Sequence, residues 1–173
     1  MAEGKLAPVS AAGEKKAGRT VVVVGVDDSE HSYHALEWTV RHVTAGMAGG
    51  AGAELVVVHA KPSPSSVVSF GGPAAGAAVR CVEADLRKTA DAVVERARRV
   101  CVANSVEALI EVVEGEPKNV LCGAAEKHGA DLLAVGSHGH GAIKRALQGS
   151  VSAYCARHAR CSVMIVKRPS PKH

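Results

Sequence analysis

Residues 20–29 have the sequence Thr-Val-Val-Val-Val-Gly-Val-Asp-Asp-Ser, and the architecture of the chain can be worked out from this stretch. Its apolar run over residues 21–26 shows no alternation of polar and apolar positions, which is typical of a strand covered on both faces. Ser29 is a residue type that caps helices, and it opens a segment of helical spacing that ends near Gly46. We therefore expect a buried strand, a tight turn and a helix in that order.

Strand and helix patterns alternate along the rest of the chain. Further apolar runs predict strands over residues 55–60, 106–113, 132–135 and 162–166. Helical spacing predicts a long helix after residue 78, a second helix that follows Gly115-Glu116-Pro117 and closes at Gly129, and a third over residues 150–158. This alternation predicts an α/β fold with an open, doubly wound parallel sheet of five strands, which is Rossmann-like.

The predicted domain occupies residues 20–168 of the 173-residue chain. Residues 1–19 combine Ala, Gly, Lys and Glu without periodicity, and we expect a disordered leader there. Residues 169–173 are expected to form a frayed tail. Residues 61–78 are rich in Pro, Ser, Gly and Ala and predict a flexible excursion rather than a helix or strand.

Composition argues against several classes of protein. Aromatic residues make up 2% of the chain and its 21 basic residues are scattered, so nucleic acid is not an expected partner. No run reaches the roughly 20 apolar residues that a membrane span requires, and no signal peptide is evident. Five cysteines without a Cys-x-x-Cys pair indicate reduced thiols, so we expect a cytoplasmic protein, with the nucleus as an additional compartment.

A glycine-rich segment follows the fourth predicted strand. It begins Gly136-Ser137-His138-Gly139-His140-Gly141, and Gln148-Gly149-Ser150-Val151-Ser152 then opens the last helix. In an open α/β sheet, ligands bind outside the carboxyl ends of the strands, where a helix N-terminus attracts anions. Glycines at 136, 139 and 149 let the backbone approach a ligand, and the serines at 137 and 150 can add hydroxyl contacts. The segment therefore predicts a phosphate-binding loop; the alternative is that these are ordinary loop glycines of a small α/β protein.

This segment matches neither of two common phosphate-binding patterns. No Gly-Lys-Ser/Thr follows the run, which disfavours a P-loop, and no Gly-x-Gly-x-x-Gly follows the first strand, which disfavours a dinucleotide site. The first strand ends at Val26, so Asp27 lies at the same edge of the predicted sheet. Asp27 can contact a ribose, an adenine amine or a phosphate-bound Mg²⁺; the alternative is that it only caps the first helix.

The spacing Gly136-x-x-Gly139, nine residues, then Gly149-Ser150 resembles the ATP-binding motif of the universal stress protein family. The Val-Asp-x-Ser turn after the first strand, the Val-Val-His-Ala end of the second strand and Gly115 are also similar to that family. The resemblance covers residues 20–167, and the Ser- and Pro-containing segment after the second strand looks like plant members.

The resemblance implies the strand order 3-2-1-4-5, with adenine between the ends of strands one and two and phosphates on the glycine loop and last helix. The residues that it carries over are Asp27, Val58, Gly136, Gly139, Gly149 and Ser150. Val58 would act through its backbone, and Val26 and Val135 would form apolar walls. Val151, which follows Ser150, is a further candidate binding residue. The implied ligand is ATP, with ADP or AMP as alternatives. A Mg²⁺ ion bound to the phosphates could also contact Asp27.

Two histidines lie within the glycine loop. Protonated His138 or His140 would favour phosphate binding and make it dependent on pH. The pair also has His-x-His spacing, but the sequence shows no third metal ligand beside it.

The resemblance also implies a homodimer that pairs the fifth strands, and residues 163–166 form an apolar edge that fits this expectation. The expected function is an ATP-binding regulatory module of stress responses whose state depends on nucleotide occupancy. Two alternatives stay open: a slow ATPase or adenylate-transferring enzyme, and a chaperone-like dimer with incidental nucleotide. No nucleophile with an oriented base is evident, so no catalytic residue is assigned.

Overall fold

The computed structural model describes residues 18–46, 52–67, 72, 75–137 and 150–169. The strands in these ranges are β1 (Thr20–Val26), β2 (Ala53–Lys61), β3 (Ala108–Glu114), β4 (Leu132–Gly136) and β5 (Ser162–Val166). The helices are α1 (Glu30–Thr39), the π-helical turn η1 (Val40–Thr44), α2 (Pro64–Val67), α3 (Ala75–Ala103), α4 (Pro117–Lys127) and α5 (Ser150–His158). The predicted leader and tail lie outside the described residues except for residues 18, 19 and 169.

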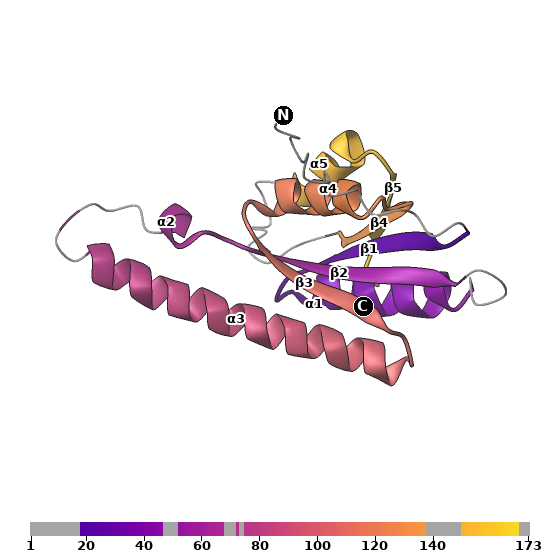
Figure 1. Cartoon of the computed structure of the whole chain (residues 1–173), viewed down its shortest axis with the longest axis horizontal. Helices are drawn as coiled ribbons and strands as arrows, with labels where there is room; N and C mark the ends of the chain where they lie inside the picture. Colours follow the sequence, from indigo (N-terminus) through magenta and orange to yellow (C-terminus); the bar gives the residue numbers. More distant parts are fainter. Residues whose placement is uncertain (1–17, 47–51, 68–71, 73–74, 138–149, 170–173) are drawn as a thin grey trace, which may run out of the picture.

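The five strands form one sheet in the order β3-β2-β1-β4-β5, and every neighbouring pair is parallel (Figure 1). The predicted doubly wound parallel sheet and its strand order are therefore confirmed. Because all strands run the same way, their carboxyl ends meet at a single edge. That edge brings the end of β1 beside the end of β2, where Val26 is the register partner of His59.

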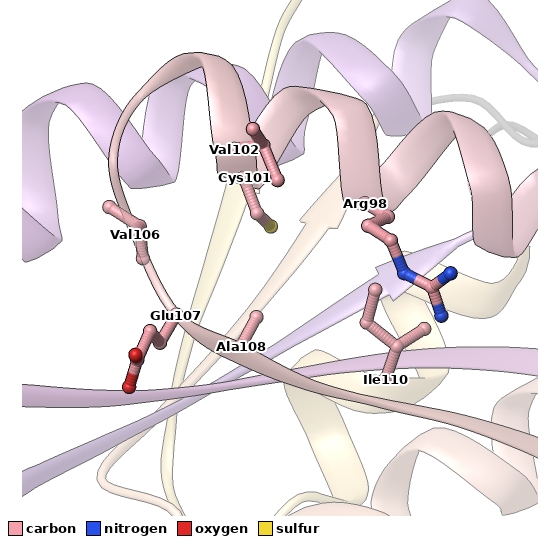
Figure 2. A pocket seen from close by; sticks show the side chains of 7 residues that line it. All are labelled: Arg98, Cys101, Val102, Val106, Glu107, Ala108 and Ile110. Atoms are coloured by element: carbon pink, nitrogen blue, oxygen red, sulfur yellow. The ribbon is translucent and has the colours of Figure 1, made fainter.

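Two of the predicted element boundaries need correction, and the first is the start of β3. The strand was predicted to begin at Val106 but begins at Ala108. The N–H of Val106 instead donates to the carbonyl of Cys101 at 3.0 Å, and Ser105 has a φ of 55°. These contacts form a Schellman closure of α3, so Val106 belongs to the turn (Figure 2).

The second correction concerns the predicted excursion over residues 61–78, which contains regular structure. Lys61 ends β2, residues 64–67 form α2, and α3 begins at Ala75. Alanine has the highest helix propensity, so the run Ala-Gly-Ala-Ala after Ala74 extends α3 toward the N-terminus despite its glycine. The first turns of α3 lie against α2 rather than over the sheet, and the helix buries side chains only from Ala90 onward (Figure 1).

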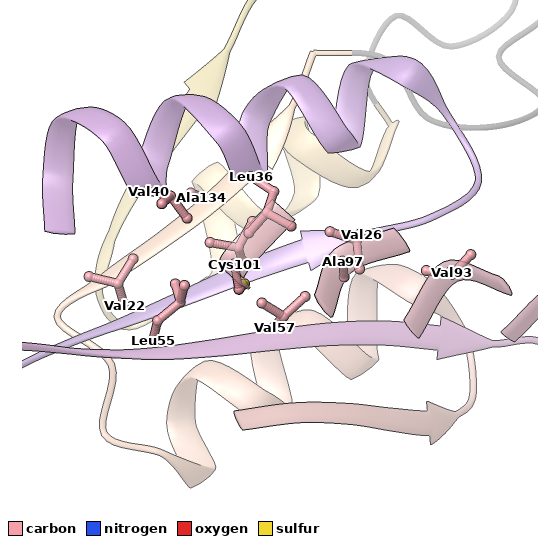
Figure 3. Close-up of a cluster of buried hydrophobic side chains, with 11 residues drawn as sticks. Val22, Val26, Leu36, Val40, Leu55, Val57, Val93, Ala97, Cys101 and Ala134 are labelled. Carbon is pink, nitrogen blue, oxygen red and sulfur yellow. The ribbon is translucent and has the colours of Figure 1, made fainter. Parts of the chain in front are cut away.

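Both faces of the sheet are covered, which explains the continuous valine run of β1. Helices α1 and α3 pack on one face, where Leu36 and Val93 belong to the same buried cluster as Val22 and Val24 of β1; Figure 3 shows this cluster. Helices α4 and α5 pack on the other face around Val23. All five of these side chains are 0% exposed. Successive valines of β1 therefore pack into opposite cores, and neither face of the strand is exposed to solvent, where a polar residue would be expected.

Helix α1 continues directly into η1. The last residue of η1, Thr44, lies close to Gly46, where the first helix was predicted to end. The N-terminal residue of α1 is preceded by Ser29, whose side chain accepts a hydrogen bond from the N–H of Ser32, as expected for a cap. Thr39 and Thr44 donate from their hydroxyls to carbonyls four residues earlier, at 2.7 Å and 2.6 Å. Such threonine back-bonding competes with the helical ladder and accompanies the widened turn of η1.

Candidate functional site

The candidate site lies at the carboxyl edge of the sheet, between β1 and its neighbours. Register pairs between β1 and β4 end at Val24 and Ala134, whereas both strands continue for two more residues. The strand order reverses at this position, since β2 lies on one side of β1 and β4 on the other. This is the switch point at which open α/β sheets bind their ligands.

Asp27 is held in the turn between β1 and α1. Its Oδ1 atom accepts a hydrogen bond from the backbone N–H of Ser29 at 2.9 Å and another from the Ser29 hydroxyl. The Asp27 N–H donates to Oγ of Ser32 at 3.1 Å. The cap of α1 is Ser29 itself, so Asp27 supports the capping residue and does not cap the helix directly.

His59 and Ser32 are two site residues that the sequence analysis missed. His59 is 5% exposed, and its Nδ1 atom lies 3.0 Å from the carbonyl oxygen of Val26. Ser32 is also 5% exposed, and its Oγ lies within 3.0 Å of the carbonyl oxygens of Asp27 and Ser29. The signal for His59 was present, because it is a polar residue that directly follows the buried run of β2.

Three of the four predicted site valines, Val26, Val58 and Val135, are core residues near this edge. Val26 is 4% exposed and belongs to the cluster on the α1 and α3 face. Val58 and Val135 belong to the cluster on the α4 and α5 face and are 0% and 4% exposed. The side chains of Val26 and Val135 therefore point to opposite faces of the sheet, and their role as apolar walls stays a prediction. Val58 precedes His59 in β2 and is the register partner of Gly25, and the contact of its backbone with adenine stays a prediction.

Gly136 ends β4 against the first turn of α1. A Cβ atom on Gly136 would lie 2.9 Å from the carbonyl carbon and oxygen of His31. The glycine is thus explained by the packing of α1 on β4, a reason that does not involve a ligand. Next to it, the N–H of Ser137 donates to the carbonyl of Val166 at 3.1 Å and ties the end of β4 to β5.

The remaining predicted residues belong to the loop and to the start of α5. His138, Gly139, His140 and Gly149 lie outside the described residues. Ser150 is the first residue of α5, and half-buried Val151 follows it. Because α5 connects two adjacent parallel strands, it begins at the carboxyl edge, and its first N–H groups have no acceptor within the helix. These donors suit an anion.

Charged side chains surround the first turn of α1. The carboxylate of Glu30 accepts from the guanidinium of Arg96 at 2.7 Å, and this hydrogen bond lowers the pKa of Glu30. The same guanidinium lies 3.8 Å from the ring centroid of Tyr33. Burial raises the pKa of Tyr33, and its hydroxyl has no hydrogen-bond partner among the residues that the structure describes. At the neighbouring strand ends, Lys61 pairs with Glu114 at 3.3 Å.

A cavity of about 470 Å³ lies elsewhere, between the end of α3 and the start of β3 (Figure 2). It is lined mainly by apolar side chains, with Arg98 and Glu107 at its rim. Its strand residues include Ala108, the first residue of β3, so the cavity is at the amino edge of the sheet. It contains none of the predicted site residues.

The donor chemistry of the carboxyl edge fits an adenine nucleotide. The carboxylate of Asp27 can accept from a ribose hydroxyl or an amine, and the start of α5 can bind a phosphate. Among the described residues, no three His, Cys, Asp or Glu side chains lie together as a metal site. Likewise, no helix in the described ranges could cross a membrane.

The strand order, the two-sided helical layers and the switch-point edge define an open, doubly wound α/β protein of the Rossmann-like class. The chain belongs to the universal stress protein family, whose model, described as "Universal stress protein family", matches residues 18–167. The family resemblance noted in the sequence is thereby confirmed.

Curated relatives agree with this assignment. The chain is 44% identical over 54 residues to Universal stress protein A-like protein from Arabidopsis thaliana, an alignment that covers 31% of each chain. It is 30% identical over 174 aligned positions to Universal stress protein PHOS34 from the same plant, covering 89% of this chain and 64% of the relative. The chain thus spans less than two thirds of the length of these relatives.

Solved structures share the fold over nearly their full length. UspA from Lactobacillus plantarum is 23% identical, with a TM-score of 0.66 and coverage of 85% of this chain and 97% of that one. A universal stress protein in complex with cAMP is 27% identical, with a TM-score of 0.62 and coverage of 85% and 96%. A family member from Arabidopsis thaliana with AMP bound is 22% identical, with a TM-score of 0.61 and coverage of 87% and 93%.

Proposed function

We propose that this chain is a regulatory module of stress responses that binds ATP at the carboxyl edge of its sheet. The observation that carries the proposal is the fixed carboxylate of Asp27, held through Ser29 at the switch point on the edge where α5 begins. Family members were solved with cAMP and with AMP, which supports an adenine nucleotide as the ligand.

Each part of the edge would contact a different part of the nucleotide. The adenine base would lie between the ends of β1 and β2, beside the backbone of Val58 and the carboxylate of Asp27. The phosphates would lie on the N–H groups that begin at Ser150, with Gly139 and Gly149 leaving room for them. Mg²⁺ would enter with the phosphates, and a contact with it is the alternative role of the Asp27 carboxylate.

Asp27→Asn is the variant that tests this assignment. Asparagine keeps the oxygen that accepts from Ser29, so the turn and the cap of α1 should persist while the charge is lost. We expect affinity for ATP to fall about tenfold, the scale of one lost charge-assisted hydrogen bond. Asp28→Asn is the matched control, because Asp28 is the exposed neighbour in the same turn. Equal affinity of Asp27→Asn and Asp28→Asn for ATP would show that Asp27 does not contact the nucleotide.

We also propose that the module is a homodimer through β5. This strand is one edge of the sheet, and Ile165 in it is 41% exposed. Ile165→Lys should convert a dimer to a monomer in sedimentation analysis, because a lysine would be desolvated by strand pairing across a twofold axis. Leu109→Lys on the opposite edge strand β3, where Leu109 is 48% exposed, is the control and should leave the oligomeric state unchanged.

The proposed location is the cytoplasm, with the nucleus as a further compartment. All five cysteines are free thiols, and Cys81 among them is exposed. Free exposed thiols persist in reducing compartments. Imaging of the full-length protein with a fluorescent tag tests this location, and retention in the secretory pathway would contradict it.

A further inference from the structure

We propose that His59 is a positioning residue of this site, which clamps the peptide unit between Val26 and Asp27 and so fixes the direction in which the Asp27 side chain leaves β1. The inference rests on the proposed nucleotide site and deepens it. It assigns a role to a buried histidine that does not itself have to touch the nucleotide.

The first step of the argument is the loss of support at the end of β1. Register pairs with β4 stop at Val24, while those with β2 continue to Val26. Within the sheet, Val26 is therefore aligned from the β2 side, and its register partner there is His59. The position of Val26, the last residue before Asp27, therefore depends on its contacts with β2.

The second step is the hydrogen bond that His59 supplies. Its Nδ1 lies 3.0 Å from the carbonyl oxygen of Val26, and the histidine is 5% exposed. A carbonyl oxygen can only accept, so this hydrogen bond requires the tautomer in which Nδ1 carries the proton. A buried carbonyl that loses such a donor is left without a hydrogen bond, at a cost in free energy. The backbone at Val26 is then expected to shift.

The third step is that the same peptide unit is held at its other end. The carbonyl of Val26 and the N–H of Asp27 belong to one planar group. His59 binds the oxygen of this group, and Oγ of Ser32 accepts from its N–H at 3.1 Å. Two buried side chains from different elements thus fix the plane of a single peptide, at the residue whose carboxylate forms the proposed site.

The test compares two substitutions of His59 that separate its hydrogen bond from its volume. His59→Asn places an amide nitrogen where Nδ1 lies but leaves a cavity, whereas His59→Leu fills the volume without a donor. His42→Leu is the control, because exposed His42 of η1 also contacts a backbone carbonyl, that of Trp38 at 2.9 Å, but away from the end of β1. The measurements are ATP affinity and, in ligand-free protein, hydrogen exchange of the Asp27 amide.

We expect His59→Leu to weaken ATP binding about tenfold and to speed exchange of the Asp27 amide by a similar factor. His59→Asn should stay within about threefold of the parent in both, although its cavity makes it less stable in urea. A merely structural histidine would give the opposite order, with the asparagine variant the weaker binder. Weaker ATP binding by His59→Asn than by His59→Leu would overturn the inference. So would an unchanged exchange rate of the Asp27 amide in His59→Leu.

A parent protein that binds no ATP would contradict the proposed function and not by itself the clamp. The exchange rates are measured without nucleotide, so they still decide whether His59 holds the peptide before Asp27.

Discussion

Gly136 lies so close to His31 that a Cβ atom on the glycine would be 2.9 Å from the carbonyl carbon and oxygen of His31. The obstacle is backbone, which cannot rotate away as a flexible side chain can. The end of β4 and the first turn of α1 therefore require a glycine for packing. The glycines expected to face phosphate are those at 139 and 149, and Gly136 is a poor probe of ligand space.

Gly136→Ala should destabilise the protein by about 1–3 kcal/mol, because α1 must shift to accept the new methyl group. Urea unfolding measures this loss. Gly123→Ala in α4 is the matched control, since a Cβ there meets nothing within 4 Å. That variant should be stabilised by about 0.5–1 kcal/mol through helix propensity. A Gly136→Ala protein as stable as its parent would contradict the close contact.

The ion cluster at Glu111 predicts a pH-dependent contribution to stability. Glu111 accepts from Nε2 of His128 at 3.0 Å and from Nζ of Lys127 at 3.1 Å. Partial burial raises the pKa of this carboxyl, but the two hydrogen bonds outweigh it and the net pKa is below the usual value of 4.5. The stabilisation is therefore complete above pH 4.5 and disappears as the pH falls through the lowered value.

Glu111→Gln should consequently be less stable than the parent at pH 7, with the difference shrinking below pH 4.5. Urea unfolding between pH 7 and pH 3 measures it. Glu126→Gln, which removes an exposed pair with Arg160, should show little difference at any pH. A constant deficit of Glu111→Gln over the whole range would mean that the charge of Glu111 is not the cause.

The thiol of Cys155 should be chemically inert in the folded protein. It is 0% exposed, and burial, with the neighbouring Cys122 sulfur at 3.9 Å, raises its pKa to about 12. Alkylation proceeds through the thiolate, so iodoacetamide at pH 8 should modify exposed Cys81 at least about a hundredfold faster than Cys155. Peptide mass spectrometry reads out both sites. Equal rates in native buffer would show that α5 opens readily.

Tyr33→Phe should leave stability unchanged or raise it by up to about 1 kcal/mol. The hydroxyl of Tyr33 is buried without a hydrogen-bond partner in the described part of the chain, whereas the ring contact with Arg96 is retained by phenylalanine. Thermal and urea unfolding of the ligand-free protein test this. A loss of stability of about 1 kcal/mol or more would show that the hydroxyl makes a favourable contact in solution.

Much of the fold could be predicted because local sequence patterns were sufficient to identify its strands and helices. The valines of β1 and β2 enter both cores, so an uninterrupted apolar run was sufficient to predict central parallel strands. The closure of α4 at Gly129 is confirmed, because its φ of 59° suits glycine. The start of α3 was missed, since high alanine propensity competed with flanking Gly, Pro and Ser and a local pattern does not say which prevails.

The site was less accessible to sequence reasoning because its contacts join distant elements. The resemblance places Asp27 and Val58 at one edge; Asp27 directly follows β1, whereas β2 continues past Val58 to Lys61. The bond from His59 to Val26 spans 33 positions, and the approach of Gly136 to His31 depends on how α1 packs. No periodicity encodes such pairs, so they emerge only once the strands are aligned.

Calorimetric titration of the purified full-length protein with ATP, ADP and AMP, each with and without Mg²⁺, tests the central claim most directly. The account predicts saturable binding of ATP with one site per chain, weakened by Asp27→Asn and unaffected by Asp28→Asn, with intact ATP recovered by chromatography. Recovery of ADP or AMP instead would make the protein an enzyme rather than a regulatory module. Absence of binding for all three nucleotides would contradict the account.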